Sequence, residues 1–115
     1  MRPKRLSSTA MAVYVDDAFV HADWGRWTGG GHLQADSFEE LEAFARRLGL
    51  KPEWVQRREG RPDRDHYDLN RVGRDAAIVL GAIPETAREG VVRRRAARPE
   101  GGWSGRRART EVTAR

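Results

Sequence analysis

The stretch that decides the fold is Ser37-Phe-Glu-Glu-Leu-Glu-Ala-Phe-Ala-Arg-Arg-Leu-Gly49. Ser37 is a favoured N-cap residue, and Glu40 follows three positions later, as in a capping box. Gly49 is typical of the residue that ends a helix in the left-handed conformation. One apolar stripe recurs between them at helical spacing, formed by Phe38, Leu41, Phe44, Ala45 and Leu48. The stretch therefore predicts a helix over residues 38–48 with one buried face.

Two short segments on either side of this helix have the composition of strands. Residues 12–15 are β-branched and aromatic and end in Asp16-Asp17, which predicts a buried strand. Residues 54–56, with the sequence Trp-Val-Gln, predict a second short strand, and a charged turn follows over residues 57–64.

A second helix is predicted before Gly81, with Asn70 or Asp68 as its N-cap. Its expected apolar face consists of Leu69, Val72, Ala76, Val79 and Leu80. Strands that alternate with helices indicate an α/β fold. We therefore expect one small α/β domain over residues 11–90, with a short sheet and two main helices.

The termini differ from this body in charge. Residues 1–10 carry a net charge of +3 and residues 91–115 carry +6, whereas residues 11–90 carry −4. We expect residues 1–10 to be a disordered extension, with Met11 as an alternative start, and residues 91–115 to be a disordered Arg-rich tail. The basic ends suggest weak contact with nucleic acid, but the acidic body does not.

Several classes of protein are excluded by composition. No apolar run approaches the roughly 20 residues of a membrane span, and no apolar core follows the basic residues near Met1, as a signal peptide requires. The chain has no cysteine, which rules out disulfides and thiolate metal sites. We therefore expect a cytoplasmic protein without a membrane partner.

The densest group of reactive side chains is Asp65-His66-Tyr67-Asp68-Leu69, in a chain with three histidines. In an extended segment residues two apart share a face, so His66 and Asp68 should lie together while Tyr67 points away. A histidine beside a carboxylate is a proton shuttle, a metal ligand or a hydrogen-bonded structural pair.

Other polar residues are candidates for the same site on a neighbouring strand. We expect Asp17 and His32 to join His66 and Asp68 as catalytic groups, and His66, His32 and Asp17 to be the ligands if a divalent metal ion binds. Asp36 precedes a helix N-terminus, where the helix dipole stabilises a carboxylate, so we interpret it as structural.

Short motifs in order along residues 11–83 resemble one family, a bacterial and phage domain of unknown function catalogued as number 4031. They are Val13-Tyr-Val-Asp-Asp17, Trp24-Gly-Arg26, His32-Leu-Gln-Ala-Asp36, Glu40-Leu-Glu-Ala-Phe-Ala45, Leu48-Gly-Leu50, Trp54-Val-Gln56, His66-Tyr-Asp68 and Leu80-Gly-Ala82. The resemblance implies no activity, and it places both tails outside the domain.

Three kinds of function fit these features. The first is a small hydrolase or transferase, metal-assisted or not, that acts on a nucleotide or phosphoester, with Arg26, Arg71 or Arg74 binding the anion. The second is a nucleic-acid-associated module that binds through the basic ends. The third is a protein-interaction module in which the histidines are structural.

Overall fold

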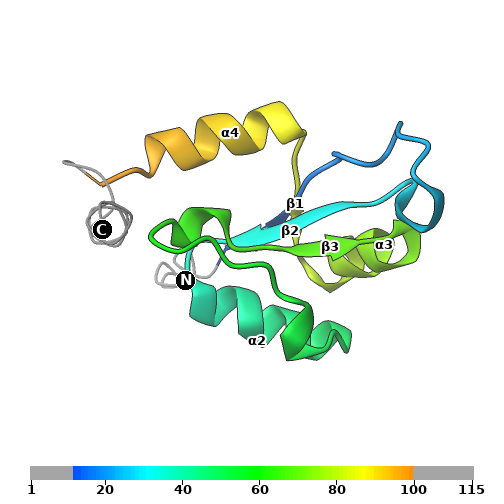
Figure 1. Ribbon diagram of the computed structural model, residues 1–115, viewed down its shortest axis with the longest axis horizontal. Coiled ribbons are helices and arrows are strands. Elements are labelled where there is room, and N and C mark those ends of the chain that lie inside the picture. The colour runs from blue at the N-terminus through cyan, green and yellow to red at the C-terminus, as the bar shows by residue number, and fades with distance from the viewer. Residues whose placement is uncertain (1–11, 100–115) are drawn as a thin grey trace, which may run out of the picture.

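A four-stranded sheet lies between helices on its two sides in the computed structural model, which describes residues 12–99 (Figure 1). The strands are β1 (Val13–Val15), β2 (Gly31–Ala35), β3 (Tyr67–Leu69) and β4 (Ile83–Pro84), and the α-helices are α2 (Phe38–Leu48), α3 (Arg71–Leu80) and α4 (Ala87–Ala96). Short 3-10 helices span Gly25–Trp27 (η2), Pro52–Trp54 (η3) and Pro62–Arg64 (η4). None of the helices described is long and apolar enough to cross a membrane.

The strand order in the sheet is β3-β2-β1-β4. β2 pairs antiparallel with both β1 and β3, and β4 pairs parallel with β1. The parallel pair needs a long crossover, which the chain makes through β2, α2, β3 and α3. The predicted small α/β domain with a short sheet is therefore confirmed.

The core lies between the sheet and the pair of helices α2 and α3, while α4 lies on the other side of the sheet (Figure 1). Each long strand gives alternate apolar side chains to this core: Val13, Val15, Leu33, Ala35, Tyr67 and Leu69. Helix α2 adds Leu41, Phe44 and Ala45, and α3 adds Ala77. The intervening strand residues are left to face α4.

Helix α2 has the bounds and caps that the sequence predicts. The Ser37 side chain accepts a hydrogen bond from the Glu40 backbone N–H at 3.1 Å, and Gly49 ends the helix at a φ of 83°. A left-handed φ is the reason for glycine at this position.

Helix α3 also lies where it was predicted, with Asn70 as its N-cap. Of its predicted buried face, Leu69 and Leu80 do contact the core, but the prediction is wrong for Val72, Ala76 and Val79, which are exposed. Val72 and Val79 are 77% and 88% exposed, whereas Ala77 is fully buried. The helix approaches the sheet through its small residues, and a Cβ on Gly73 would lie 3.3 Å from the Leu69 side chain. Leu69 itself is a strand residue.

The predicted strand over residues 54–56 is also wrong. Pro52 starts a 3-10 turn that ends at Trp54, since proline fixes a helical φ and has no N–H for a sheet ladder. Of that segment, Gln56 alone forms a bridge, with His66, through backbone hydrogen bonds of 2.8 and 3.0 Å.

The sequence predicts a disordered tail from residue 91, and this prediction is wrong for the first residues of that range. Helix α4 continues to Ala96, and a capping box between Thr86 and Glu89 starts it. The domain therefore extends beyond the predicted boundary at residue 90. The predicted disorder of residues 1–10 and of residues 100–115 falls outside the described residues.

Candidate metal centre

The polar side chains of the sheet gather on the face that looks toward α4. His32 pairs with Asp68 across the antiparallel β2 and β3, and His66 lies two residues before Asp68 on the same face. Tyr67 points the other way and is 1% exposed in the core. The predicted alternation of residues 66–68, and the predicted approach of His32 from a neighbouring strand, are both confirmed.

Three side-chain atoms of this face converge. Asp68 Oδ1 lies 3.7 Å from His32 Nε2 and 3.4 Å from His66 Nε2. All three lie within 4.8 Å of one another, and the two imidazole rings stand edge to face at 84°. The side chains of His32, His66 and Asp68 are 29%, 21% and 25% exposed, so solvent reaches the cluster.

The buried carboxylate of Asp16 fixes the His32 ring. His32 Nδ1–H donates to Asp16 Oδ2 at 3.0 Å, and the backbone N–H groups of His32 and Ala18 donate to Asp16 Oδ1. Burial alone would raise the pKa of Asp16, but these hydrogen bonds outweigh it and lower the pKa. The bond to Asp16 likewise raises the pKa of His32, against the opposing effect of its burial.

The other two members of the cluster are held in the same manner. His66 Nδ1 lies 3.0 Å from the Arg64 carbonyl oxygen, which can only accept, so Nδ1 carries the proton. Gln56 Nε2 donates to Asp68 Oδ2 at 2.7 Å. Each of the three side chains thus has one polar atom fixed by a neighbour and one directed at the common point.

This arrangement requires a positive charge at the centre of the cluster. With Nδ1 protonated, a neutral histidine presents a lone pair at Nε2, and here both Nε2 atoms face a carboxylate oxygen. Three electron pairs that point at one another repel unless a cation or an added proton lies between them. Histidines oriented by a carboxylate or a carbonyl at the second nitrogen are typical of metal ligands.

Close packing of the backbone places Asp16 beneath His32. A Cβ on Gly31 would overlap the Asp16 carbonyl oxygen, and one on Gly30 would overlap the Leu69 carbonyl oxygen. Glycine at these two positions lets the neighbouring backbone approach this closely. The Phe19 ring covers the outer side of His32, with centroids 4.9 Å apart.

One carboxylate predicted for the site, Asp17, lies elsewhere. Asp17 Oδ1 accepts from the Ala87 backbone N–H at 2.9 Å, at the start of α4, and its neighbour Asp16 is the carboxylate that contacts His32. Asp36 accepts from the Tyr14 hydroxyl at 3.1 Å, in keeping with a structural role. Of the predicted metal ligands, His32 and His66 come together and Asp68 completes the set.

A cavity of about 200 Å³ opens beside the histidines, and its cationic lining was not predicted. Arg58, Arg64 and Arg94 line it together with Asp16, His32 and His66. None of the arginines expected from the sequence, Arg26, Arg71 and Arg74, is in this lining. Arg74 Nε donates to the Asp16 carbonyl oxygen, and Arg26 lies over the Trp27 ring. Arg94 belongs to α4. The capping box at Thr86 is the sequence pattern from which this helix, and with it the position of Arg94, could have been predicted.

Comparison with models of protein families gave a match over most of the chain. A family model described as "Protein of unknown function (DUF4031)" matches residues 13–97. The chain belongs to this family. The match runs past the predicted end of the resemblance and takes in all of α4. Comparison with curated proteins and with solved structures gave no match.

Proposed function

We propose that this protein is a metal-dependent hydrolase of phosphoesters, with His32, His66 and Asp68 as the ligands of one divalent cation. The observation that carries the proposal is the convergence of two histidine Nε2 atoms and one Asp68 oxygen within 4.8 Å, each side chain oriented from behind by a separate partner.

The donor set favours an intermediate or borderline metal. Two imidazoles and one carboxylate suit Zn²⁺, Mn²⁺ or Fe²⁺ better than Ca²⁺ or Mg²⁺, which prefer oxygen ligands. Three protein ligands leave coordination positions for water and substrate, as in catalytic rather than structural sites. The exposure of all three side chains is consistent with an open coordination sphere.

The reaction that such a site supports is hydrolysis by metal-bound water. A cation held by His32, His66 and Asp68 would supply Lewis-acid activation of a water molecule, which would give a proton to solvent and form the new bond to phosphorus. The bond from phosphorus to the leaving oxygen breaks, and that oxygen takes a proton from solvent. Arg58, Arg64 and Arg94 supply positive charge beside the cluster for the negative charge of the transition state.

Metal content after purification tests the first half of the proposal. The full chain, equilibrated with Zn²⁺ or Mn²⁺ and then passed through a desalting column, is expected to retain one equivalent of metal. His66→Ala is expected to lose it. His21→Ala is the matched control, because His21 is exposed and is not part of the cluster.

An activity assay tests the second half. Hydrolysis of bis(p-nitrophenyl) phosphate should require the retained metal and should be lost in Asp68→Asn but not in Asp36→Asn. Retention of metal without metal-dependent hydrolysis would support the metal-binding site but contradict the proposal that the protein is a hydrolase. If wild type and His66→Ala both stay free of metal, a protonated His32 between Asp16 and Asp68 explains the cluster, and the structural alternative holds.

A further inference from the structure

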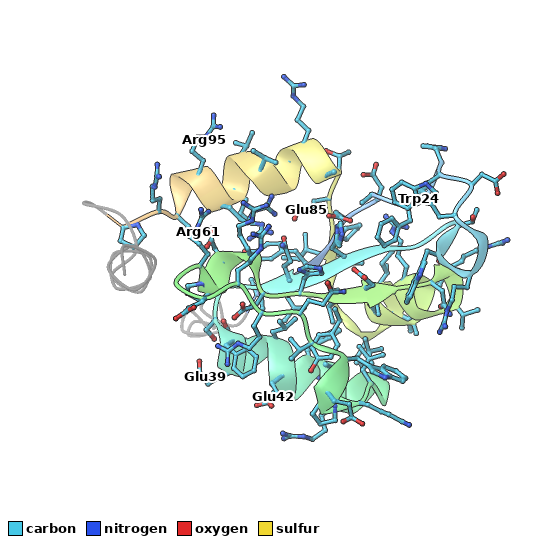
Figure 2. The ribbon with its side chains drawn as sticks, in the orientation of Figure 1. Trp24, Glu39, Glu42, Arg61, Glu85 and Arg95 are labelled. Carbon is cyan, nitrogen blue, oxygen red and sulfur yellow. The ribbon has the colours of Figure 1, made fainter. Side chains whose placement is uncertain are left out.

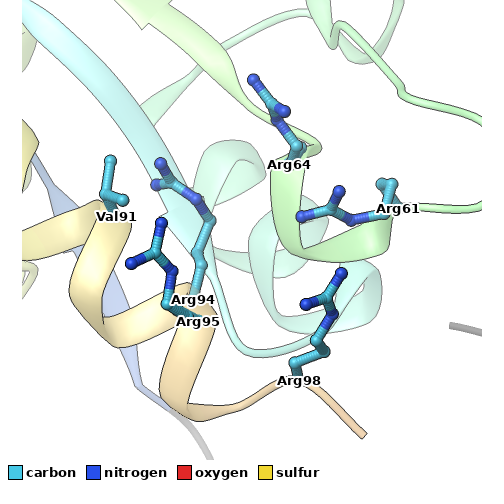
Figure 3. A pocket seen from close by; sticks show the side chains of 6 residues that line it. All are labelled: Arg61, Arg64, Val91, Arg94, Arg95 and Arg98. Carbon is cyan, nitrogen blue, oxygen red and sulfur yellow. The ribbon is translucent and has the colours of Figure 1, made fainter. Parts of the chain in front are cut away.

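A row of arginines continues from the candidate metal centre along the gap between η4 and α4. This arginine groove, a cavity of about 280 Å³, is lined by Arg61, Arg64, Val91, Arg94, Arg95 and Arg98. Arg61 immediately precedes η4 and Arg64 is its last residue. Val91, Arg94 and Arg95 belong to α4, and Arg98 follows it (Figure 3). Segments about thirty residues apart in the sequence thus contribute to one cationic surface.

The positive charge of the groove is largely uncompensated. Arg61 pairs with Asp63 at 2.8 Å, and Arg93, at the side of the groove, pairs with Glu85. Within residues 12–99, no carboxylate lies in ion-pair distance of Arg64, Arg94, Arg95 or Arg98. Burial, with Arg93 and Arg64 nearby, lowers the pKa of Arg94, as expected where guanidinium groups crowd together.

The arginine groove adjoins the cavity at the histidines. Arg64, Val91 and Arg94 line both. Arg94 Nη1 also donates to Gln34 Oε1 at 2.6 Å, which ties the groove to the polar face of the sheet two residues beyond His32. A ligand that lies in the groove therefore has one end beside His32 and His66.

The lining indicates which chemical groups the groove accepts. Guanidinium forks match phosphate oxygens, and among residues 12–99 no aromatic side chain lines the groove for stacking with a base. A third cavity, of about 470 Å³, is lined by Asp68 together with Trp27 and Trp54, whose rings can stack with bases. The cavities with the arginines and the cavity with the tryptophans thus reach the same cluster, the former at the histidines and the latter at Asp68.

We propose that the arginine groove binds the sugar-phosphate backbone of a single-stranded nucleic acid and leads one phosphodiester to His32, His66 and Asp68. The inference rests on the proposed function for the cleavage step, whereas binding in the groove is independent of the metal. A single strand fits the lining, because the arginines of the η4 and α4 regions flank one groove and can contact one backbone from its two sides. Recognition through phosphates, with aromatic stacking that accepts any base, makes binding indifferent to sequence.

Salt-dependent binding of a fluorescent oligothymidylate to the full chain tests this inference by anisotropy. The buffer contains a chelator, so that failure of the metal site and failure of the groove are distinguishable. Wild type is expected to bind, with an affinity that falls as salt rises. In Arg64→Ala/Arg98→Ala the slope of log affinity against log salt should shrink by about 1.4, or roughly 0.7 for each lost phosphate contact.

Arg88→Ala/Arg47→Ala is the matched control, because it removes the same charge from residues that do not line the groove. It should keep the wild-type slope within about 0.3, less than half of one phosphate contact. Equal losses in the two double variants, or no binding at low salt, would overturn the proposal. Displacement of the strand by equimolar ATP would overturn it in favour of a nucleoside triphosphate.

Discussion

The two faces of the sheet are built by the same short strands and differ in almost every other respect. Toward α2 and α3 the strands present fully buried apolar residues such as Val15 and Leu33. Toward α4 they present His32, Gln34, His66 and Asp68. Arginines such as Arg61 and Arg95 lie on this side of the sheet (Figure 2). The apolar face fixes where the strands lie, and that position brings the polar atoms of the other face together.

The largest expected effect is on the apolar face. Leu33→Ala should lower the free energy of unfolding by about 2–5 kcal/mol, because it removes a fully buried side chain and leaves a cavity. Gln34→Ala, one residue along and on the opposite face, loses the two hydrogen bonds that Gln34 Oε1 accepts from Arg93 and Arg94. It should cost about 1–2 kcal/mol, because both guanidinium groups are only partly buried and can bind water instead. Urea unfolding followed by tryptophan fluorescence measures both. Equal losses would contradict the division between the faces.

On the polar face the effect should appear in metal affinity and not in folding. His66→Ala removes a proposed ligand and should weaken Zn²⁺ binding by more than about 100-fold, the upper range for a change outside the ligand set. Isothermal titration calorimetry gives the affinity, and unfolding in the absence of metal gives the stability. A loss of stability as large as that of Leu33→Ala would show that His66 stabilises the fold, and would contradict the prediction.

A smaller effect on metal affinity is expected at Asp16, which orients the ligand His32 without binding the metal itself. Asp16→Asn keeps the shape of the side chain but removes the charge that orients His32, so Zn²⁺ affinity should fall by about 10- to 100-fold. Asp17→Asn is the adjacent control and should leave the affinity unchanged, since Asp17 contacts the start of α4. Reversed results for this pair would restore Asp17 to the site.

The smallest effect is expected at Gln56, which holds the outer oxygen of Asp68 from an exposed position. Gln56→Ala should weaken Zn²⁺ binding by no more than about tenfold, the lower range for an outer partner. Gln56→Glu should weaken it further, because a second carboxylate would repel Asp68. The same calorimetric titration measures both variants, and tighter binding in either would show that Gln56 does not orient Asp68.

The apolar face was predictable because local rules specify it. The Ser37 cap, the Gly49 terminus and the period of the apolar residues act within one helix, and α2 follows them residue for residue. The alternation of His66, Tyr67 and Asp68 is equally local. Helix α3 shows the limit of such rules, since close approach at Gly73 and Ala77 outweighs the pattern of its larger residues.

The rest of the site depends on contacts between distant segments, for which the sequence has no spacing rule. Asp16 and Asp17 are chemically identical neighbours, and the course of the chain after β1 decides which one faces His32. Helix α4 has little apolar periodicity, so its arginines resembled a disordered tail. The Thr86 and Glu89 pair was the one local sign of a helix there.

The most direct test of the central claim is X-ray absorption spectroscopy of the full chain loaded with one equivalent of Zn²⁺. Two imidazole ligands are expected in the wild type, with the remaining positions filled by oxygen, and fewer than two in His66→Ala, which no longer retains the metal at the site. His21→Ala should give the wild-type spectrum. An all-oxygen first shell, or a spectrum that His66→Ala leaves unchanged, would contradict a metal centre at His32, His66 and Asp68.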